Sequence, residues 1–321
     1  MSKPRANEVL ILVKKRIFVF LAGIAVSGLS GTRLPAQGYG PPLKPETHVF
    51  ATVDGVNLKA YVFRPDEALY PSPRLAIVIF HGGGWSLGEP EWAFGRAQHF
   101  AGQGMVGVAA QYRLSDQKKV TPLEAMVDAR AVIRWLRSNS GSLGIDPSRI
   151  AAYGWSSGGH LAVSAAIFDK AESSPKVSAA PDALILVSPA VHLETDSWVQ
   201  RLLGSRASAS SISPASHVRA GLPPTIILQG DVDTVTPLAG ARLFRDRMVA
   251  AGNRCELHIY PGMGHMFTPA GIPDDGWPQP DPKVQADALK KAVGFLASLG
   301  YIKQNAPGDT SASTGGGARP H

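Results

Sequence analysis

Residues 149–168 read RIAAYGWSSGGHLAVSAAIF, and this stretch decides the fold. It opens with a short apolar run that is typical of a strand and continues, from residue 157, with the pattern of a helix. Ser156 stands between them in a Gly-x-Ser-x-Gly frame, where Gly154 and Gly158 permit a sharp turn that lifts the serine above a sheet. The pattern predicts a strand–turn–helix unit with Ser156 as a nucleophile, the alternative being a small residue in a glycine-rich loop.

Strand and helix patterns alternate over most of the remaining chain. Residues 48–63 have the signature of a hairpin around Gly55, and the continuous apolar runs at 74–80 and 105–112 are typical of strands covered on both faces. This alternation predicts an α/β fold with a mainly parallel central sheet, an antiparallel start and helices on both faces. Residues 190–222 lack a strong period and are expected to form an insertion over the sheet edge, with one or two short helices.

A catalytic serine needs a neighbouring base, and the base needs an acid that holds its tautomer. His265 is the predicted base, because it lies in the loop PGMGHMF that follows a late strand, and such loops collect active-site residues in open α/β sheets. Asp233, in LQGDVDTVTP, is the predicted acid. Asp231 follows the same strand more closely and is the alternative, with capping of the turn as its expected role. Ser, then acid, then His is the chain order of the α/β-hydrolase arrangement.

Donors for an oxyanion are expected in the loop HGGGW, residues 81–85, directly after the 74–80 strand. Consecutive glycines let backbone N–H groups approach a ligand without side-chain obstruction. Gly83 and Gly84 are the predicted donors, together with the N–H of Ser157 at the start of the helix. His81 is expected to hold this loop and to take no part in proton transfer.

Five motifs, HGGGW, QYRLS, GWSSGGHLA, GDVDTVTP and GMGHMF, together resemble the α/β-hydrolase superfamily over nearly all of the body. Within it they resemble the esterase/lipase branch related to hormone-sensitive lipase, and more closely secreted acetyl and feruloyl esterases that act on xylan. The resemblance implies an α/β-hydrolase fold and ester hydrolysis. Two departures matter: the long N-terminal cap of the hormone-sensitive-lipase type has no counterpart, and Trp85 and Ser157 stand where that type has phenylalanine and alanine.

With no large cap domain, the serine is expected to lie in an open cleft that suits a short acyl group on a bulky alcohol such as a polysaccharide. Trp85 and Trp155 are the predicted substrate-binding walls of this cleft, with Met266 and Phe267 beside them. For each of these four residues, burial in the core is the alternative.

Residues 1–36 are predicted to be a signal peptide. The cationic cluster at 14–16 precedes an uncharged stretch, 17–32, which is shorter than the roughly 20 residues of a membrane span. An uncleaved anchor is the alternative, and either one predicts a secreted or periplasmic body. Six basic residues against one acidic residue lie before residue 34, so this leader carries most of the net charge of +7.

The body has no long basic run that would track phosphates, so no nucleic-acid partner is predicted, nor a stable membrane partner. Residues 37–47 are a predicted linker, 48–304 the hydrolase domain and 305–321 a disordered tail. The sole cysteine, Cys255, cannot form an internal disulfide and is expected to pack as a small hydrophobe. No metal cluster or nucleotide fingerprint is found, so no cofactor or metal is predicted, and the oligomeric state stays open.

The leading hypothesis is a secreted serine carboxylesterase for short-chain acyl esters, with acetyl esters of carbohydrates such as xylan as a specific case. A serine peptidase and an arylformamidase of the same fold are alternatives. Related serine peptidases usually carry a separate propeller domain, for which we expect no room in this sequence. The predicted export signal argues against an intracellular arylformamidase. A non-catalytic binding module on this scaffold is a third alternative, for which the loss of a triad member would be the sign; none is missing.

Overall fold

The computed structural model describes residues 44–116, 119–169, 177–273 and 276–302. The predicted signal peptide (1–36) and the predicted tail (305–321) lie outside these ranges, as does most of the predicted linker. The first strand, β1 (Glu46–Val53), begins inside the predicted linker 37–47, because Glu46 and Thr47 already pair with the next strand.

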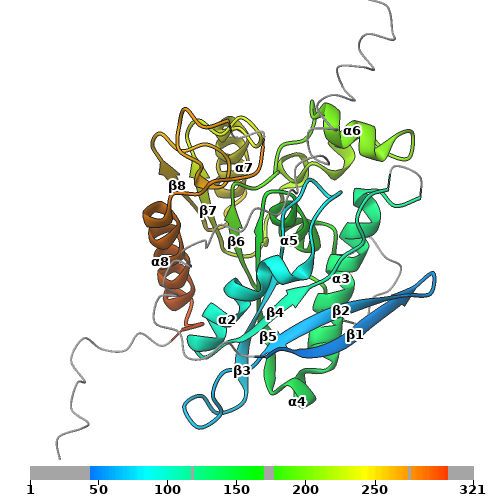
Figure 1. The fold of residues 1–321 in the computed structure, drawn as a ribbon, viewed down its shortest axis with the longest axis vertical. Helices are drawn as coiled ribbons and strands as arrows, with labels where there is room; N and C mark the ends of the chain where they lie inside the picture. The colour runs from blue at the N-terminus through cyan, green and yellow to red at the C-terminus, as the bar shows by residue number, and fades with distance from the viewer. Residues whose placement is uncertain (1–43, 117–118, 170–176, 274–275, 303–321) are drawn as a thin grey trace, which may run out of the picture. The chain divides into compact units, whose positions relative to one another are not determined.

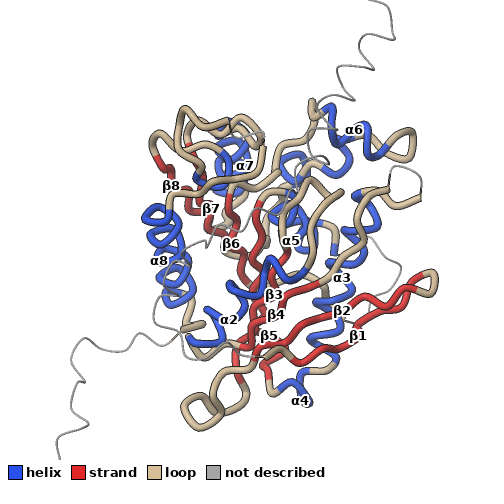
Figure 2. Tube along the Cα trace, in the orientation of Figure 1, coloured by secondary structure: helices blue, strands red, loops and turns tan. Residues whose placement is uncertain are grey.

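Eight strands form one sheet in the order β1-β2-β4-β3-β5-β6-β7-β8 (Figures 1 and 2). β1 and β2 (Val56–Phe63) form the predicted antiparallel hairpin, and the turn between them has left-handed backbone at Asp54 and Gly55 (φ 49° and 77°), as a tight hairpin turn requires. β2 pairs antiparallel with β4, and all later pairings are parallel. The remaining strands are β3 (Arg74–Phe80), β4 (Val106–Ala110), β5 (Ile145–Trp155), β6 (Ala183–Val187), β7 (Thr225–Gly230) and β8 (Cys255–Tyr260).

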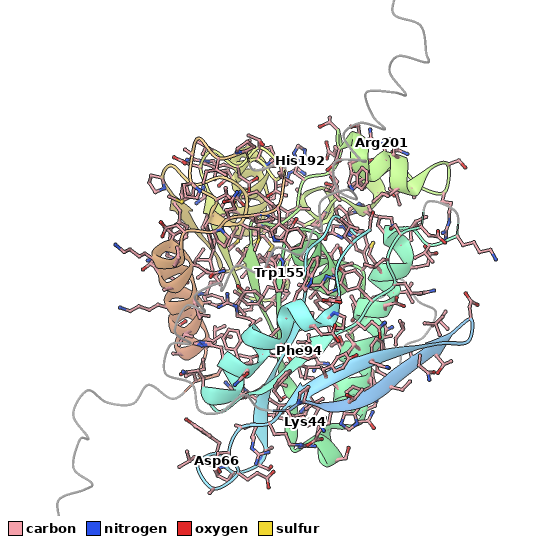
Figure 3. The ribbon with its side chains drawn as sticks, viewed as in Figure 1. Lys44, Asp66, Phe94, Trp155, His192 and Arg201 are labelled. Carbon is pink, nitrogen blue, oxygen red and sulfur yellow. The ribbon has the colours of Figure 1, made fainter. Side chains whose placement is uncertain are left out.

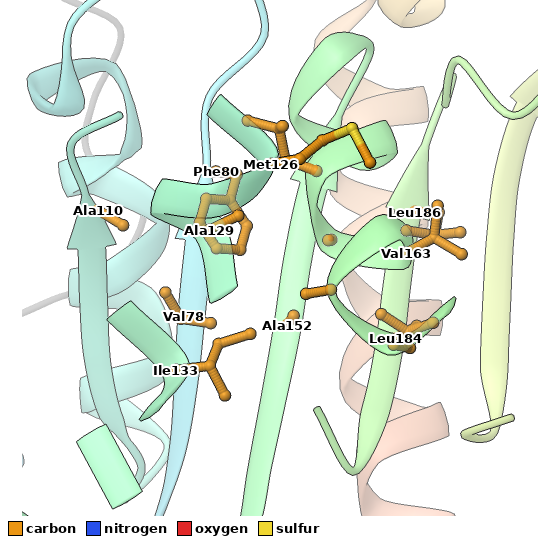
Figure 4. Close-up of a cluster of buried hydrophobic side chains, with 14 of the residues drawn as sticks. Val78, Phe80, Ala110, Met126, Ala129, Ile133, Ala152, Val163, Leu184 and Leu186 are labelled. Atoms are coloured by element: carbon orange, nitrogen blue, oxygen red, sulfur yellow. The ribbon is translucent and has the colours of Figure 1, made fainter. Parts of the chain in front are cut away.

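Helices cover both faces of the sheet because the central strands are apolar on both sides. In β3, Ile77 and Ile79 belong to the cluster that α2 and α8 cover, whereas Val78 and Phe80 belong to the cluster on the opposite face, beneath α3 and α5 (Figure 4). The helices are α2 (Phe94–Gly102), α3 (Pro122–Ser138), α4 (Ser140–Leu143), α5 (Ser157–Ile167), α6 (Ser197–Leu203), α7 (Leu238–Ala250) and α8 (Pro282–Ser298). The predicted mainly parallel α/β fold is therefore confirmed.

The insertion between β6 and β7 consists of α6 and two short 3-10 turns, η3 (Ala209–Ile212) and η4 (Pro214–His217). It is held against the helix layer: the Ile212 carbonyl oxygen bonds to His160 Nε2 of α5 at 2.9 Å, and Arg206 forms an ion pair with Glu124 of α3 at 2.6 Å. α3 itself begins with Thr121 and Glu124 in a reciprocal capping box and with proline in the first turn. Within the described ranges, no helix has the length and apolar composition needed to cross a membrane.

Candidate active site

The nucleophile turn lies between β5 and α5. Ser156 has left-handed backbone (φ 53°, ψ −124°), a strained conformation for a residue with a side chain. A Cβ added to Gly154 would lie 2.1 Å from the Gly158 carbonyl oxygen, and one added to Gly158 would lie 2.2 Å from that of Phe80. Both flanking glycines are therefore required by close backbone approach, and the predicted strand–turn–helix unit is present.

His265 lies between the two other predicted members of the triad. Its Nε2 is 3.0 Å from Ser156 Oγ, and its Nδ1 is 3.0 Å from Asp233 Oδ2. The Asp233 side chain is fully buried and the imidazole nearly so. Asp233 comes from the loop after β7, and His265 opens the short turn η5 (His265–Phe267) after β8. The three side chains thus meet at the carboxyl ends of neighbouring parallel strands, with the imidazole placed to accept the serine proton.

The Asp233 carboxylate is fixed by several donors besides His265. Oδ2 accepts hydrogen bonds from Gln229 Nε2 and Thr236 Oγ1, each at 2.9 Å, and Oδ1 accepts from the backbone N–H groups of Val235 at 3.0 Å and Thr236 at 2.7 Å. Asp231 is exposed and accepts from the Gly262 N–H at 2.7 Å. The structure therefore places Asp233 next to the imidazole and gives Asp231 the capping role.

Ser188, directly after β6, links the acid loop to the base loop. Its Oγ accepts a hydrogen bond from the Met266 N–H at 3.1 Å, and its carbonyl oxygen accepts one from Thr236 Oγ1 at 3.0 Å. Ser188 is fully buried and has left-handed backbone (φ 42°). Ser188 was not predicted from the sequence; the available signal was a serine directly after a buried strand, at the edge where the other site residues were expected.

The glycine loop after β3 lies against the nucleophile turn. A Cβ on Gly82 would meet the Trp155 indole at 2.7 Å, and one on Gly83 (φ 124°) would lie 2.1 Å from the Leu87 carbonyl oxygen. Among the residues that the structure describes, none accepts a hydrogen bond from the N–H groups of Gly83, Gly84 or Ser157. Backbone donors of this kind, on a glycine loop and at a helix start, are those that stabilise a developing oxyanion.

His81 holds the glycine loop in the way the sequence predicts. Its Nδ1 donates to the Gly82 carbonyl oxygen at 2.7 Å, and its ring stacks on Tyr112 at a centroid distance of 4.4 Å. The Tyr112 hydroxyl donates to the His81 carbonyl oxygen at 2.9 Å. Burial lowers the pKa of His81 to about 4, so the imidazole is neutral near neutral pH.

Trp85 differs from its predicted placement. Trp85 is 3% exposed and belongs to the core cluster, where its ring packs edge-on against His160 at 5.2 Å; the prediction that it lines the cleft is wrong, and burial in the core, the alternative, is what the structure shows. Phe267 is buried as well, whereas Trp155 and Met266 are half-buried. Figure 3 labels Trp155 at the strand ends, with Arg201 of α6 farther out.

Trp198 of α6 lies beside the glycine loop and was not predicted from the sequence. Its Nε1 donates to the Gly84 carbonyl oxygen at 3.2 Å, which places the indole beside the glycine loop. The two residues are far apart in sequence, and no local pattern marks their contact. Arg201 lies over the same indole, 5.6 Å from its centroid.

The described part of the chain supports neither a metal site nor a cysteine nucleophile. No group of three or more His, Cys, Asp or Glu side chains there is arranged to hold a metal ion. Burial raises the pKa of Cys255 to about 12, so this residue is a protonated thiol rather than a nucleophile at neutral pH.

A mainly parallel eight-stranded sheet with a serine after β5, an acid after β7 and a histidine after β8 defines the α/β-hydrolase class of serine hydrolases. Residues 62–248 match the BD-FAE family model, and the chain belongs to this family.

Solved structures of esterase 2 from Thermogutta terrifontis are similar to the chain. The propionate-bound form is 35% identical in sequence and has a TM-score of 0.72. The match covers 82% of this chain and 97% of the esterase chain. Esterase LipQ of Mycobacterium tuberculosis is 28% identical over 64% of this chain and 52% of its own length. Endo-1,4-beta-xylanase B of Butyrivibrio fibrisolvens is 26% identical over 67% of this chain and 35% of its own. The chain thus spans about half, or less, of the curated relatives it matches.

Proposed function

We propose that the protein is a serine carboxylesterase that hydrolyses short-chain acyl esters. The observation that carries this proposal is the hydrogen-bonded series Ser156–His265–Asp233 beside the N–H groups of Gly83, Gly84 and Ser157. A nucleophile, a base held in one tautomer and donors for an oxyanion are the parts that acyl transfer requires.

In the acylation step, His265 Nε2 accepts the proton of Ser156 Oγ as this oxygen attacks the carbonyl carbon of the ester. The carbonyl oxygen becomes an oxyanion and accepts hydrogen bonds from the glycine loop and from the Ser157 N–H. The tetrahedral intermediate then collapses: the bond to the alkoxy oxygen breaks, and His265 donates its proton to the leaving alcohol.

Deacylation repeats the sequence with water as the nucleophile. His265 takes a proton from the water, hydroxide adds to the acyl carbon, and the bond to Ser156 Oγ breaks as the serine regains its proton. Asp233 keeps Nδ1 of the imidazole protonated throughout and stabilises the transient imidazolium. The products are a carboxylic acid and the free enzyme.

A short acyl group is favoured by the relatives and by the residues around the serine. Structures of the Thermogutta terrifontis esterase carry propionate and butyrate, the acids of short-chain esters. Trp155 lies against Gly82 and Trp198 against Gly84, and these two indoles are the proposed walls for the acyl group.

For the alcohol, we propose a carbohydrate, with acetylated xylan as the specific case. Partial similarity to a xylanase supports this assignment, and so does the predicted export of the protein, which would bring it to polymeric substrates. N-terminal sequencing of the protein recovered outside expressing cells checks the export, with loss of residues up to about position 36 as the expected result.

The test of the proposed function compares wild type with Ser156→Ala on an aryl acetate. We expect kcat to fall by at least about 10⁴-fold, because the variant has no nucleophile. An organophosphonate should add its mass to wild type and leave the variant unlabelled, while unchanged circular dichroism shows that the variant folds. Undiminished hydrolysis by Ser156→Ala would refute the proposal. A panel of acetylated xylan, peptide amides and N-formyl substrates separates an esterase from a peptidase and an arylformamidase.

A further inference from the structure

Two tryptophans outside the triad stand exposed as a pair. Trp92 is 37% exposed and Trp277 is 60% exposed, and their rings are perpendicular, with centroids 5.1 Å apart and an interplanar angle of 89°. Trp92 lies in the short turn η1 (Pro90–Ala93), directly before α2, and Trp277 lies in the segment before α8. Indole rings usually bury most of their surface, so an exposed pair indicates a surface kept for a ligand.

The pair is continuous with both sides of the active site. The Trp92 ring packs edge-on against His81 at 5.7 Å, and His81 bonds to the carbonyl of Gly82 in the glycine loop. The segment of Trp277 is tied to the turn that carries the base: the Gln279 N–H donates to Thr268 Oγ1 at 3.0 Å. Trp92 is therefore linked to the glycine loop, and the segment of Trp277 to the turn that carries His265.

We propose that Trp92 and Trp277 form an aromatic subsite that binds a sugar ring in the alcohol part of the substrate. This inference rests on the proposed function and specifies its substrate. Two rings at right angles offer two adjoining apolar walls, against which the C–H face of a pyranose stacks while its hydroxyl groups stay in water. Because Trp92 contacts His81 of the glycine loop and the Trp277 segment is bonded to Thr268 after the base turn, we assign this ring to the sugar that carries the ester group.

Two acidic residues close to Trp92 in the chain favour a neutral sugar. Glu91 directly precedes Trp92 in the chain and Glu89 lies two residues before Glu91, and both are exposed. Carboxylates accept hydrogen bonds from sugar hydroxyl groups, and they repel an anionic ring such as a uronic acid. The proposed occupant is therefore an uncharged pyranoside that carries the acyl group on one of its hydroxyls.

The kinetic test uses two esters with the same acyl group, an acetylated xylo-oligosaccharide and ethyl acetate. For Trp277→Ala, we expect kcat/KM on the sugar ester to fall roughly tenfold more than on ethyl acetate, through KM, because only the sugar ester has a ring to stack. Trp277→Phe should recover part of the loss. Leu69→Ala, at a side chain that is 70% exposed and far along the chain from the site residues, is the matched control and should behave as wild type on both esters.

Equal losses on the two esters, or an unchanged KM for the sugar ester, would overturn the subsite. A rise in KM confined to esters of aromatic acids would also overturn it, by assigning the pair to the acyl group. Binding is measured separately by titrating Ser156→Ala with unacetylated xylohexaose. Quenching of tryptophan fluorescence that disappears in Ser156→Ala/Trp277→Ala supports the subsite even when acetylated xylan is a poor substrate, and absence of quenching in the single variant contradicts it.

Discussion

Asp233 and Trp277 lie in neighbouring loops at the same edge of the sheet, yet their surroundings are opposite. The Asp233 side chain has no exposed surface and accepts hydrogen bonds from Gln229, Thr236 and His265. Trp277 leaves 60% of its surface in water and meets Trp92 through a ring contact. Proton transfer tolerates only small displacements of the reacting atoms, so its residues are fixed by burial and bonding. A stacking surface needs no such precision, and changes there should act on KM rather than on kcat.

Among the buried catalytic residues, the largest effect on kcat is expected from Asp233→Asn. The amide no longer holds the imidazole in the tautomer that accepts the serine proton, so kcat should fall about 10⁴-fold with little change in KM. Asp231→Asn is the matched control, because that carboxylate bonds to the Gly262 N–H and lies at the surface. Steady-state kinetics on an aryl acetate measure both variants. If Asp231→Asn were the more damaging change, the acid would have been assigned to the wrong aspartate.

The buried histidines His81 and His160 make the free energy of unfolding depend on pH. Burial lowers the pKa of His81 and of His160 to about 4, against about 6.5 in the unfolded chain. Between these values the unfolded state binds more protons, so the free energy of unfolding rises with pH. The stabilisation is fully present above pH 6.5 and is lost as the pH falls towards 4, by about 3 kcal/mol for each histidine as an order of magnitude.

Urea unfolding at pH 7.5, 6 and 5 measures this loss as a falling midpoint at constant slope. His192→Gln, at an exposed position, is the control and should follow the wild-type curve. His160→Gln should flatten the dependence, since the variant has one fewer buried imidazole to protonate. A midpoint that does not move between pH 7.5 and 5 would contradict the assignment.

The same contrast explains how much could be predicted from the sequence. The fold and the positions of Ser156, Asp233 and His265 follow from local patterns, because parallel strands bring the loops at their carboxyl ends together whatever else the chain does. Trp85 was assigned to the wrong side because residues next to glycines do not reveal which way a left-handed turn sends the side chain. Trp198 contacts a residue far away in sequence, and no periodicity in one sequence encodes such a contact.

Ser188→Ala gives the smallest predicted effect. It tests whether the hydrogen bond between Ser188 and Met266 fixes the turn that carries His265. Its Oγ accepts the Met266 N–H directly after His265, and Met266 itself has left-handed backbone (φ 54°). Loss of this acceptor leaves a backbone donor unpaired and loosens the turn that carries the base. We expect kcat to fall roughly tenfold with KM unchanged, the equivalent of one lost hydrogen bond.

Ser188→Gly separates the hydroxyl from the backbone at this position. Glycine also lacks the Oγ but adopts the φ of 42° without strain, so this variant should be more heat-stable than Ser188→Ala while losing as much kcat. Thermal unfolding and steady-state kinetics on the same aryl acetate give the two numbers for each variant. If Ser188→Gly kept the wild-type kcat, the backbone conformation rather than the hydrogen bond to Met266 would be what positions His265. Ser188 would then belong to the fold and not to the site.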